Sequence, residues 1–278
     1  MSLRRFVPAL LALALPVPAL AQGIIVAPHL VHIDHRLRSG QLILLNPGTR
    51  PVEVEVSTVF GYPGTDSTGR VVLVTEPEPG PDRPSAAGWI QAYPRRATVP
   101  PGERQVVRLL ARPPAGLPDG EYWTRLVVAA REAPPPPAPA DSAPEGVTIG
   151  LSLEVRTILA LIYRKGAVTG GVSVRALPAE VRGDSLAFGV ALERAGTAAW
   201  LGMLRTELRD SAGALRARDS SQLAVYYPMT PRYRLPVAGL PPGRYRVRLT
   251  LDVERDDVPP EVRLPLPPVH DSLDVTIP

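Results

Sequence analysis

The residues of this chain that could bind a metal are its histidines. Three of the four lie close together, at His29, His32 and His35, and the fourth is His270. Three imidazoles are a ligand set that zinc accepts, and spacings of three residues would bring them together on a helix. The surrounding sequence is instead typical of a strand and a turn, where residues three apart point to opposite faces. The sequence therefore predicts no metal site and no cofactor.

The sequence also offers no catalytic nucleophile in a recognisable setting. It contains no cysteine, no G-x-S-x-G motif and no phosphate-cradling glycine loop. Four aspartates lie in turn-like segments, where aspartate commonly makes local hydrogen bonds: Asp66, Asp82, Asp256 and Asp257. We therefore expect a protein that is not an enzyme.

The most distinctive pattern is an alternation of apolar and polar residues that begins at Val147. Apolar residues recur at every second position, which predicts a strand with one face made for burial. Four of them, called the apolar stripe below, are Ile149, Leu151, Leu153 and Val155. From Ile158 to Tyr163 both faces are apolar, as in a strand that is covered on both sides. The whole strand is expected to span 147–164, about twice the usual length.

A proline-rich segment precedes this strand. Residues 132–146, E-A-P-P-P-P-A-P-A-D-S-A-P-E-G, cannot form a helix or a central strand, because proline lacks the amide donor and clashes with the preceding backbone. We expect a loose, extended loop, so no tight hairpin fixes the apolar stripe in its own sheet. The stripe either completes the protein's own sheet or is lent to another protein.

The start of the chain resembles an export signal. Two arginines are followed by an apolar run from Phe6 to Leu20 and by small residues before Gln22. This pattern predicts a secretory signal peptide over residues 1–21, cleaved after Ala21, and a periplasmic protein with no membrane insertion after cleavage. Subtracting the two leader arginines from the formal net charge of +4 leaves about +2, which is too little to predict a nucleic-acid partner.

The composition argues against long helices, because 278 residues include 35 prolines and 23 glycines. Short segments of strand-forming residues recur instead, each bounded by proline or glycine. The sequence predicts an all-β fold of two immunoglobulin-like β-sandwich domains, over residues 22–164 and 165–278. The expected strands are 24–31, 41–45, 52–58, 71–74, 89–92, 105–111, 122–129 and 147–164 in the first domain, and 185–193, 200–208, 223–227, 233–237 and 245–253 in the second.

The first of these domains resembles the N-terminal domain of the periplasmic pilus-assembly chaperones, the PapD-like family. That family shows a proline, a Pro-Gly turn, a Gln-x-x-Arg strand and an acidic-aromatic-Trp strand. The corresponding residues here are Pro94, Pro101-Gly102, Gln105 with Arg108, and Glu121-Tyr122-Trp123. The resemblance covers residues 23–166, whereas the second domain shows no clear match. It implies two immunoglobulin-like domains and the binding of pilus subunits by strand donation.

The chain departs from the family where the subunit's C-terminal carboxylate is bound. The family uses an arginine on the first strand and a lysine late on the long strand, and the corresponding residues here are Leu30 and Ala160. Neither side chain can bind a carboxylate. Arg36, Arg156 and Arg164 are candidate substitutes for this contact.

Two functions remain open. One is a periplasmic chaperone that binds secreted pilus or fimbrial subunits by lending them the apolar stripe, with an outer-membrane usher as a further partner that the resemblance allows. The other is a structural or adhesive protein of the cell envelope that covers its own long strand and has no chaperone activity. Because an exposed, flat, apolar edge promotes aggregation, the strand needs either a partner or a cover.

Overall fold

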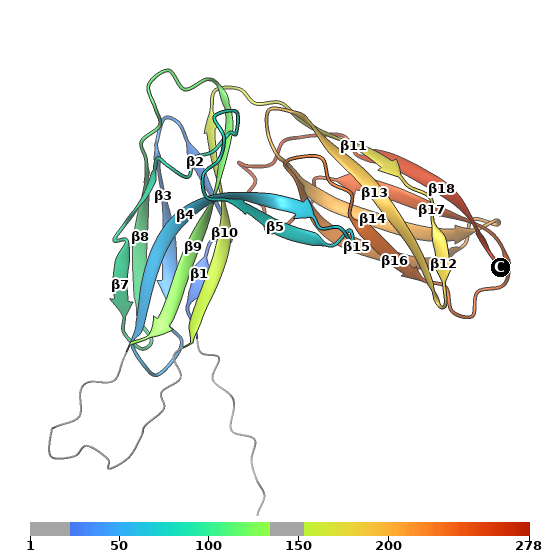
Figure 1. Cartoon of the computed structure of the whole chain (residues 1–278), viewed down its shortest axis with the longest axis horizontal. Helices are drawn as coiled ribbons and strands as arrows, with labels where there is room; N and C mark the ends of the chain where they lie inside the picture. The colour runs from blue at the N-terminus through green and yellow to red at the C-terminus, as the bar shows by residue number, and fades with distance from the viewer. Residues whose placement is uncertain (1–22, 134–152) are drawn as a thin grey trace, which may run out of the picture.

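The computed structural model describes residues 23–133 and 153–278. These residues form strands and loops without a helix, and they are arranged in two lobes that meet at an angle (Figure 1). Each lobe contains two packed sheets, so the predicted all-β fold of two immunoglobulin-like sandwiches is confirmed. In this part of the chain no helix is long and apolar enough to cross a membrane. The predicted leader, residues 1–21, lies outside the described residues.

The first sandwich is built from strands β1 to β10. One sheet has the order β1-β3-β8-β6, and the other has the order β2-β10-β9-β4-β5, with β7 also paired to β4. The strands are β1 (Ile25–Ala27), β2 (Leu30–Asp34), β3 (Ser39–Leu45), β4 (Val52–Thr65), β5 (Val71–Glu76), β6 (Ile90–Tyr93), β7 (Arg96–Val99), β8 (Arg104–Ala111), β9 (Gly120–Glu132) and β10 (Glu154–Lys165).

The first predicted strand, 24–31, is wrong as a single element. It is divided into β1 and β2, which belong to different sheets. The division falls at Pro28, which follows a cis peptide bond and has no amide proton to continue the ladder. Residues 25–34 therefore contribute to both layers of the sandwich.

The second sandwich is built from strands β11 to β18. One sheet has the order β11-β13-β12, with β16 also paired to β13, and the other has the order β15-β14-β17-β18. The strands are β11 (Gly170–Ala176), β12 (Glu180–Arg182), β13 (Ser185–Gly196), β14 (Trp200–Asp210), β15 (Leu215–Val225), β16 (Arg232–Pro236), β17 (Gly243–Asp252) and β18 (Val269–Ile277). The domain boundary placed between residues 164 and 165 stays a prediction.

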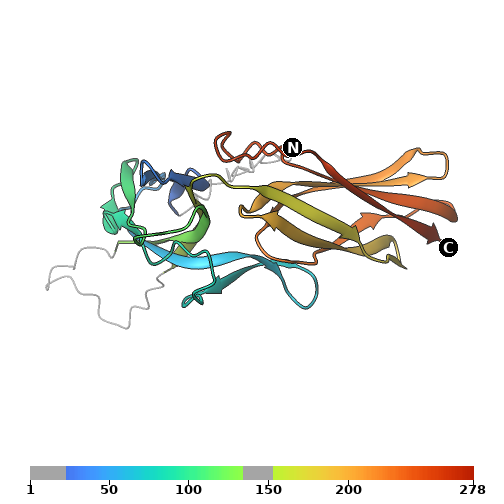
Figure 2. The same ribbon diagram turned by 90° about the horizontal axis from the view of Figure 1, so that it is seen from above.

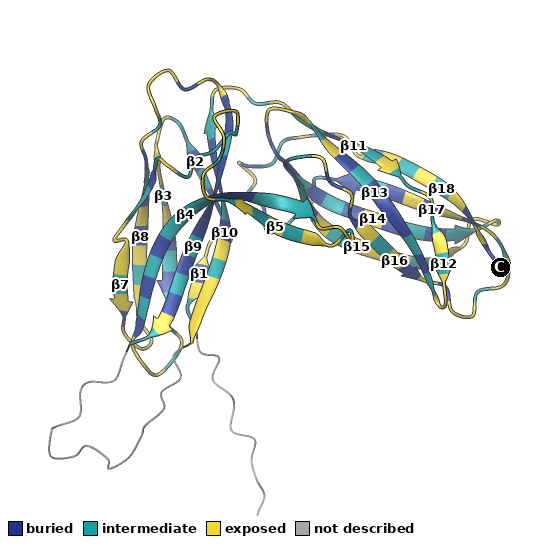
Figure 3. Cartoon of the chain, viewed as in Figure 1, coloured by how far each residue is buried: buried dark blue, intermediate teal, exposed yellow. Residues whose placement is uncertain are grey.

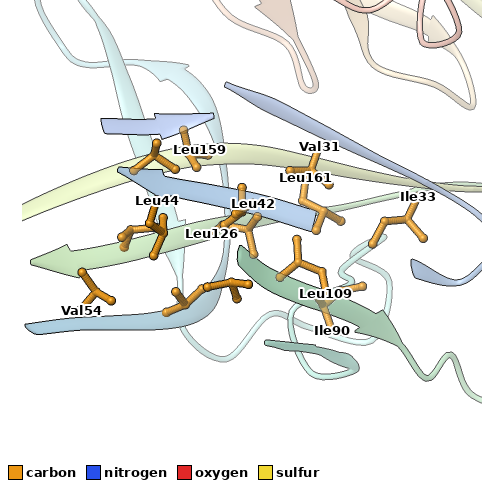
Figure 4. Close-up of a cluster of buried hydrophobic side chains, with 14 of the residues drawn as sticks. Val31, Ile33, Leu42, Leu44, Val54, Ile90, Leu109, Leu126, Leu159 and Leu161 are labelled. Carbon is orange, nitrogen blue, oxygen red and sulfur yellow. The ribbon is translucent and has the colours of Figure 1, made fainter. Parts of the chain in front are cut away.

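Each sandwich has its own apolar core. In the first, residues of both sheets point toward one another, among them Leu42, Leu109, Leu126 and Leu161 (Figure 4). The second core contains Trp200 together with inward-facing residues of the strands around it. Because every second residue of these strands faces a core, the period-two pattern of the sequence accounts for both lobes.

The two lobes are joined by a third apolar cluster. It contains Leu30, Phe60, Trp123 and Ile162 from the first lobe, and Ala199, Tyr226, Val258 and Val262 from the second. The rings of Trp123 and Tyr226 meet edge to face, with their centroids 4.8 Å apart. This cluster gives the junction a buried apolar centre.

The hairpin formed by β4 and β5 reaches from the first lobe toward the second (Figures 1 and 2). At its tip, the amide of Arg232 donates to the carbonyl oxygen of Gly69 at 2.9 Å. Nearer its base, the rings of Tyr62 and Tyr227 lie 4.4 Å apart. The hairpin is therefore a second bridge between the lobes.

Candidate functional site

The N-terminal half of β10 is a sheet edge. Throughout its length, from Glu154 to Lys165, β10 is paired with β9 on one side. On the other side it is paired with β2 only from Ala160 to Arg164, because β2 begins at Leu30, opposite Ala160. The nearby strand β1 belongs to the other sheet, where it pairs with β3. Residues 154–159 thus have a free side, where the main chain has no strand partner among the described residues.

The free half of β10 carries exposed apolar side chains. Leu153 is 61% exposed and Val155 is 38% exposed. Both have the same parity as Leu159 and Leu161, which are buried in the first core. On this face of β10 apolar side chains therefore extend beyond the protein's own core, interrupted by Thr157, to the start of the strand, which is exposed to solvent (Figure 3).

The other two members of the apolar stripe, Ile149 and Leu151, lie outside the described residues. Within β10, the prediction of a segment covered on both faces is wrong at Ile158, the first residue of that segment. The segment from Ile158 to Tyr163 was expected to be covered on both faces, yet Ile158 is 44% exposed. Ile158 shares its face with Ala160 and Ile162, and the apolar cluster between the lobes that covers this face includes those two residues but not Ile158.

The opposite face of this half-strand is charged at Glu154 and Arg156 and apolar at the exposed Ile158. Arg156 Nε donates to Glu154 Oε1 at 2.7 Å, and next to this pair Arg131 Nη2 lies 2.8 Å from Glu53 Oε2. These residues belong to β10, β9 and β4, which are neighbours in the sheet. A strand added to the free side would thus lie beside an apolar row on one face, and on the other face beside solvated charged residues followed by Ile158.

The three arginines suggested as carboxylate contacts have different environments. Arg36 lies just beyond β2 with an almost fully exposed side chain, 3.6 Å from Asp34. Arg156 is also exposed and is paired with Glu154. The side chain of Arg164 is only 11% exposed and each of its three nitrogens donates a hydrogen bond: Nε to Glu121 Oε2 at 2.7 Å, Nη2 to the carbonyl oxygen of Val262 at 2.7 Å, and Nη1 to the carbonyl oxygen of Glu261 at 3.4 Å. Arg164 therefore links the two lobes, because it is bonded to Glu121 of the first lobe and to Val262 of the second.

Glu121 is the centre of that junction. Its carboxylate is completely buried and accepts hydrogen bonds from Trp123 Nε1 at 2.6 Å and from the amide of Ala199 at 2.9 Å, in addition to the bond from Arg164. Ala199 belongs to the second lobe, so one carboxylate links both lobes. The sequence marked Glu121 only as part of a motif, and its structural role depends on contacts more than 40 residues away along the chain.

Leu30 and Ala160, the positions at which the resemblance puts the family's carboxylate-binding pair, lie directly opposite each other on β2 and β10. Leu30 is buried in the cluster between the lobes, and Ala160 packs against it. The next residue in this row is Arg125 on β9, which the sequence analysis did not single out. Arg125 is buried; its Nε donates to the carbonyl oxygen of Gly61 at 2.9 Å, and its Nη2 has no hydrogen-bond partner among the described residues.

The clustered histidines are not arranged as a ligand set. Among residues 23–133 and 153–278, no three His, Cys, Asp or Glu side chains are grouped so as to hold a metal ion. His32 lies on β2, where burial and the nearby Arg164 lower the pKa of its imidazole. His35 instead shares a hydrogen bond with the hydroxyl of Tyr163.

The chain was compared with known proteins. No protein-family model matches it, and no curated protein matches it. Among solved structures it is similar to the YadV chaperone, with 14% identity, a TM-score of 0.48, and coverage of 91% of this chain and 99% of that chain. It is also similar to the CsuC-CsuE chaperone-tip adhesion subunit complex of Acinetobacter baumannii, with 11% identity, a TM-score of 0.46, and coverage of 91% and 97%.

A third similar structure is the SafA pilin in complex with the SafB chaperone, from Salmonella enterica. The identity is 14%, the TM-score is 0.41, and the alignment covers 91% of this chain and 97% of that chain. At these identities the likeness concerns the fold alone.

Proposed function

We propose that this protein is a periplasmic chaperone that binds secreted, pilus-type β-proteins by lending them the free half of β10. The observation that carries the proposal is that the apolar row of β10 continues from the buried core, at Leu161 and Leu159, to the exposed residues Val155 and Leu153. An unpaired main chain beside an apolar row is the combination that strand addition uses: the backbone supplies hydrogen bonds and alternate side chains enter the partner's groove.

Apolar burial and main-chain hydrogen bonds together supply the binding energy in this proposal. Full burial of Ile149 and Leu151, together with the fractions of Leu153 and Val155 that are still exposed (61% and 38%), is worth about 4 to 9 kcal/mol, on a scale of about 1.5 to 3 kcal/mol per fully exposed side chain. Association costs about 4 to 15 kcal/mol in lost freedom. Main-chain hydrogen bonds of about 0.5 to 1.5 kcal/mol each supply the rest. Because these bonds do not depend on side chains, we expect the protein to accept partners of differing sequence.

In this proposal the C-terminal carboxylate of the partner needs a cation beside it, because burying an unpaired carboxylate at an interface costs free energy. Arg36 and Arg156 have exposed guanidinium groups and keep this role in the proposal. Arg164 does not, because its donors are used by Glu121 and by main-chain oxygens. An amidated partner terminus should bind more weakly than a free carboxylate if either arginine makes the contact.

The proposal includes no catalysis and no cofactor. The partners are secreted β-proteins, with an outer-membrane usher as a further expected partner, and the predicted leader places the encounter in the periplasm. The alternative, a structural or adhesive envelope protein, requires the chain itself to cover the β10 edge. Within the described residues nothing pairs with the free side of residues 154–159, which favours the chaperone.

Site-specific photo-crosslinking tests the proposal. A photo-reactive phenylalanine derivative replaces Leu153 in one variant and Leu215 in another; Leu215 is a comparably exposed leucine in the second lobe. We expect the Leu153 variant, illuminated in the periplasm of its own host, to form a product with a secreted β-rich protein that the Leu215 variant does not form. Identical products from both positions, or none from Leu153, would contradict strand lending.

A further inference from the structure

Strand β5 is a second open edge, at the far end of the sheet from β2. It pairs with β4 from Val71 to Glu76 and with no other strand of the described chain. Two of its apolar side chains are well exposed, with Val71 at 48% and Leu73 at 40%. Figure 3 shows exposed residues alternating along it. Its main chain on the side away from β4 is therefore available for pairing.

This edge lacks the usual protection against pairing. Natural edge strands are commonly interrupted by charges, prolines or bulges. From Val71 to Thr75 the sequence V-V-L-V-T has neither charge nor proline, and its pairing with β4 continues without a register shift. The long edge strands of the second lobe, by contrast, carry charged residues such as Arg218 on β15 and Asp271 on β18. The β5 edge is thus suited to a partner strand.

Charges are found only at the two ends of the segment, and they have opposite signs. Arg70 precedes the strand and Glu76 ends it. In an antiparallel pair of two identical strands centred on Leu73, Arg70 of each copy lies opposite Glu76 of the other. A shift by two residues keeps the faces of the sheet aligned but removes both of these pairs: in one direction Arg70 lies opposite Val74, and in the other it lies opposite Glu78, which comes after Pro77 and beyond the end of β5. One register is therefore favoured by charge complementarity.

Both charged groups are able to form this contact. Arg70 is exposed and takes part in no ion pair within the described chain. The carboxylate of Glu76 accepts from the hydroxyl of Tyr62 at 2.7 Å and from Arg83 at 3.1 and 3.2 Å. A carboxylate has about four acceptor positions, so room remains for a further arginine.

We propose that β5 pairs with β5 of a second copy of this chain, antiparallel and about a twofold axis at Leu73. The two copies then form one continuous sheet, in which Val72 lies opposite Val74 and Leu73 lies opposite Leu73. Such an interface is isologous, as in most homodimers. The contact involves few residues, so the dimer is expected to be weak and transient. The dimer contact does not involve the β10 edge. It can therefore form whether or not β10 is lent to another protein.

Cysteine crosslinking tests this register, because the natural chain contains no cysteine. In the proposed dimer the two copies of residue 73 have Cβ atoms about 5 Å apart, close enough for a disulfide. The two copies of residue 75, on the same face, are separated by about 13 Å. Under mild oxidation, Leu73→Cys should therefore form a covalent dimer at least about tenfold faster than Thr75→Cys or the second-lobe control Leu215→Cys.

Two further crosslinking experiments distinguish pairing of β5 with β5 from other contacts between two copies. In the Leu73→Cys background, Arg70→Glu should slow crosslinking about tenfold, because it places like charges opposite each other, whereas Arg104→Glu, with the same charge change on β8, should not. In a mixture, Leu73→Cys should crosslink with itself and not with Val155→Cys. Equal rates at positions 73 and 75, insensitivity to Arg70→Glu, or preferential crosslinking to position 155 would each overturn the proposal.

Discussion

Replacing Leu153 and Val155 by glutamate separates binding from stability. Both residues are already largely or partly exposed in the free protein, at 61% and 38%. Charges placed there remain in water, so the melting temperature should stay within about 2 °C of the parent, as for ordinary surface changes. In the complex, the same positions enter the apolar groove of the partner, and the charges lose their water.

The expected loss of binding follows from the exposed fractions. Burying what remains exposed is worth about 1 to 2 kcal/mol for Leu153 and about 0.6 to 1.1 kcal/mol for Val155, on a scale of about 1.5 to 3 kcal/mol per side chain. Losing this contribution alone weakens Kd about 10- to 150-fold. Desolvating two carboxylates adds to the loss, so we expect a decrease in affinity of at least about 100-fold, measured by calorimetric titration with the partner identified by crosslinking.

Leu161→Glu is the matched control. It makes the same change on the same face of β10, at a residue that is buried in the first core. A carboxylate buried there without a partner costs several kcal/mol, and the melting temperature should fall by about 10 °C or more. If the Leu153 and Val155 double variant unfolds in the same way as this control, the stripe belongs to the protein's own core and the reasoning is refuted.

Three other predictions concern the junction between the lobes. Glu121→Gln should destabilise the protein by about 3 to 5 kcal/mol in chemical denaturation, because it leaves the Arg164 guanidinium without its buried counter-charge; a change below about 1 kcal/mol would contradict this role. The lowered pKa of His32 means that the unfolded state binds its proton more readily, so stability should be complete above the ordinary pKa of 6.5 and decrease as the pH falls below it. His32→Leu should flatten this part of the stability profile, and an unchanged slope between about pH 7 and 5 would argue against it. Leu30→Arg should lower the melting temperature because Leu30 is buried in the apolar cluster between the lobes; an unchanged melting temperature would show that a charge is accommodated there.

Local patterns predicted most of the strands and both sandwiches. The alternation from Val52 to Thr58 became β4, although the strand continues to Thr65 because β5 extends the hairpin. The alternation near the C-terminus, at Leu273, Val275 and Ile277, was equally clear but was not recognised as β18. β11 was hidden because it begins with two glycines, which have low strand propensity. The strands were thus predictable from the sequence mainly where apolar residues repeat at every second position.

Only part of the candidate site could be predicted from the sequence. Periodicity shows that Leu153 and Val155 share one side of β10, but not where the neighbouring strand begins. That limit is set by Leu30, more than 120 residues earlier, through a parallel pairing with Ala160. The role of Arg164 was likewise hidden, because its partners Glu121 and Val262 come from distant parts of the chain. Sequence patterns specify faces of strands, whereas open edges and buried ion pairs depend on tertiary contacts.

Hydrogen exchange at single amides of β10 tests strand lending most directly. In the free protein, the amides of residues 154–159 that point away from β9 have no partner strand among the described residues, whereas those of residues 160–164 lie between β9 and β2. In the complex with the crosslinked partner, the free-side amides of 154–159 should exchange at least about 100-fold more slowly, because they become hydrogen bonded to an added strand. Unchanged exchange at 154–159 in a fully formed complex would show that the partner binds elsewhere and would contradict the account.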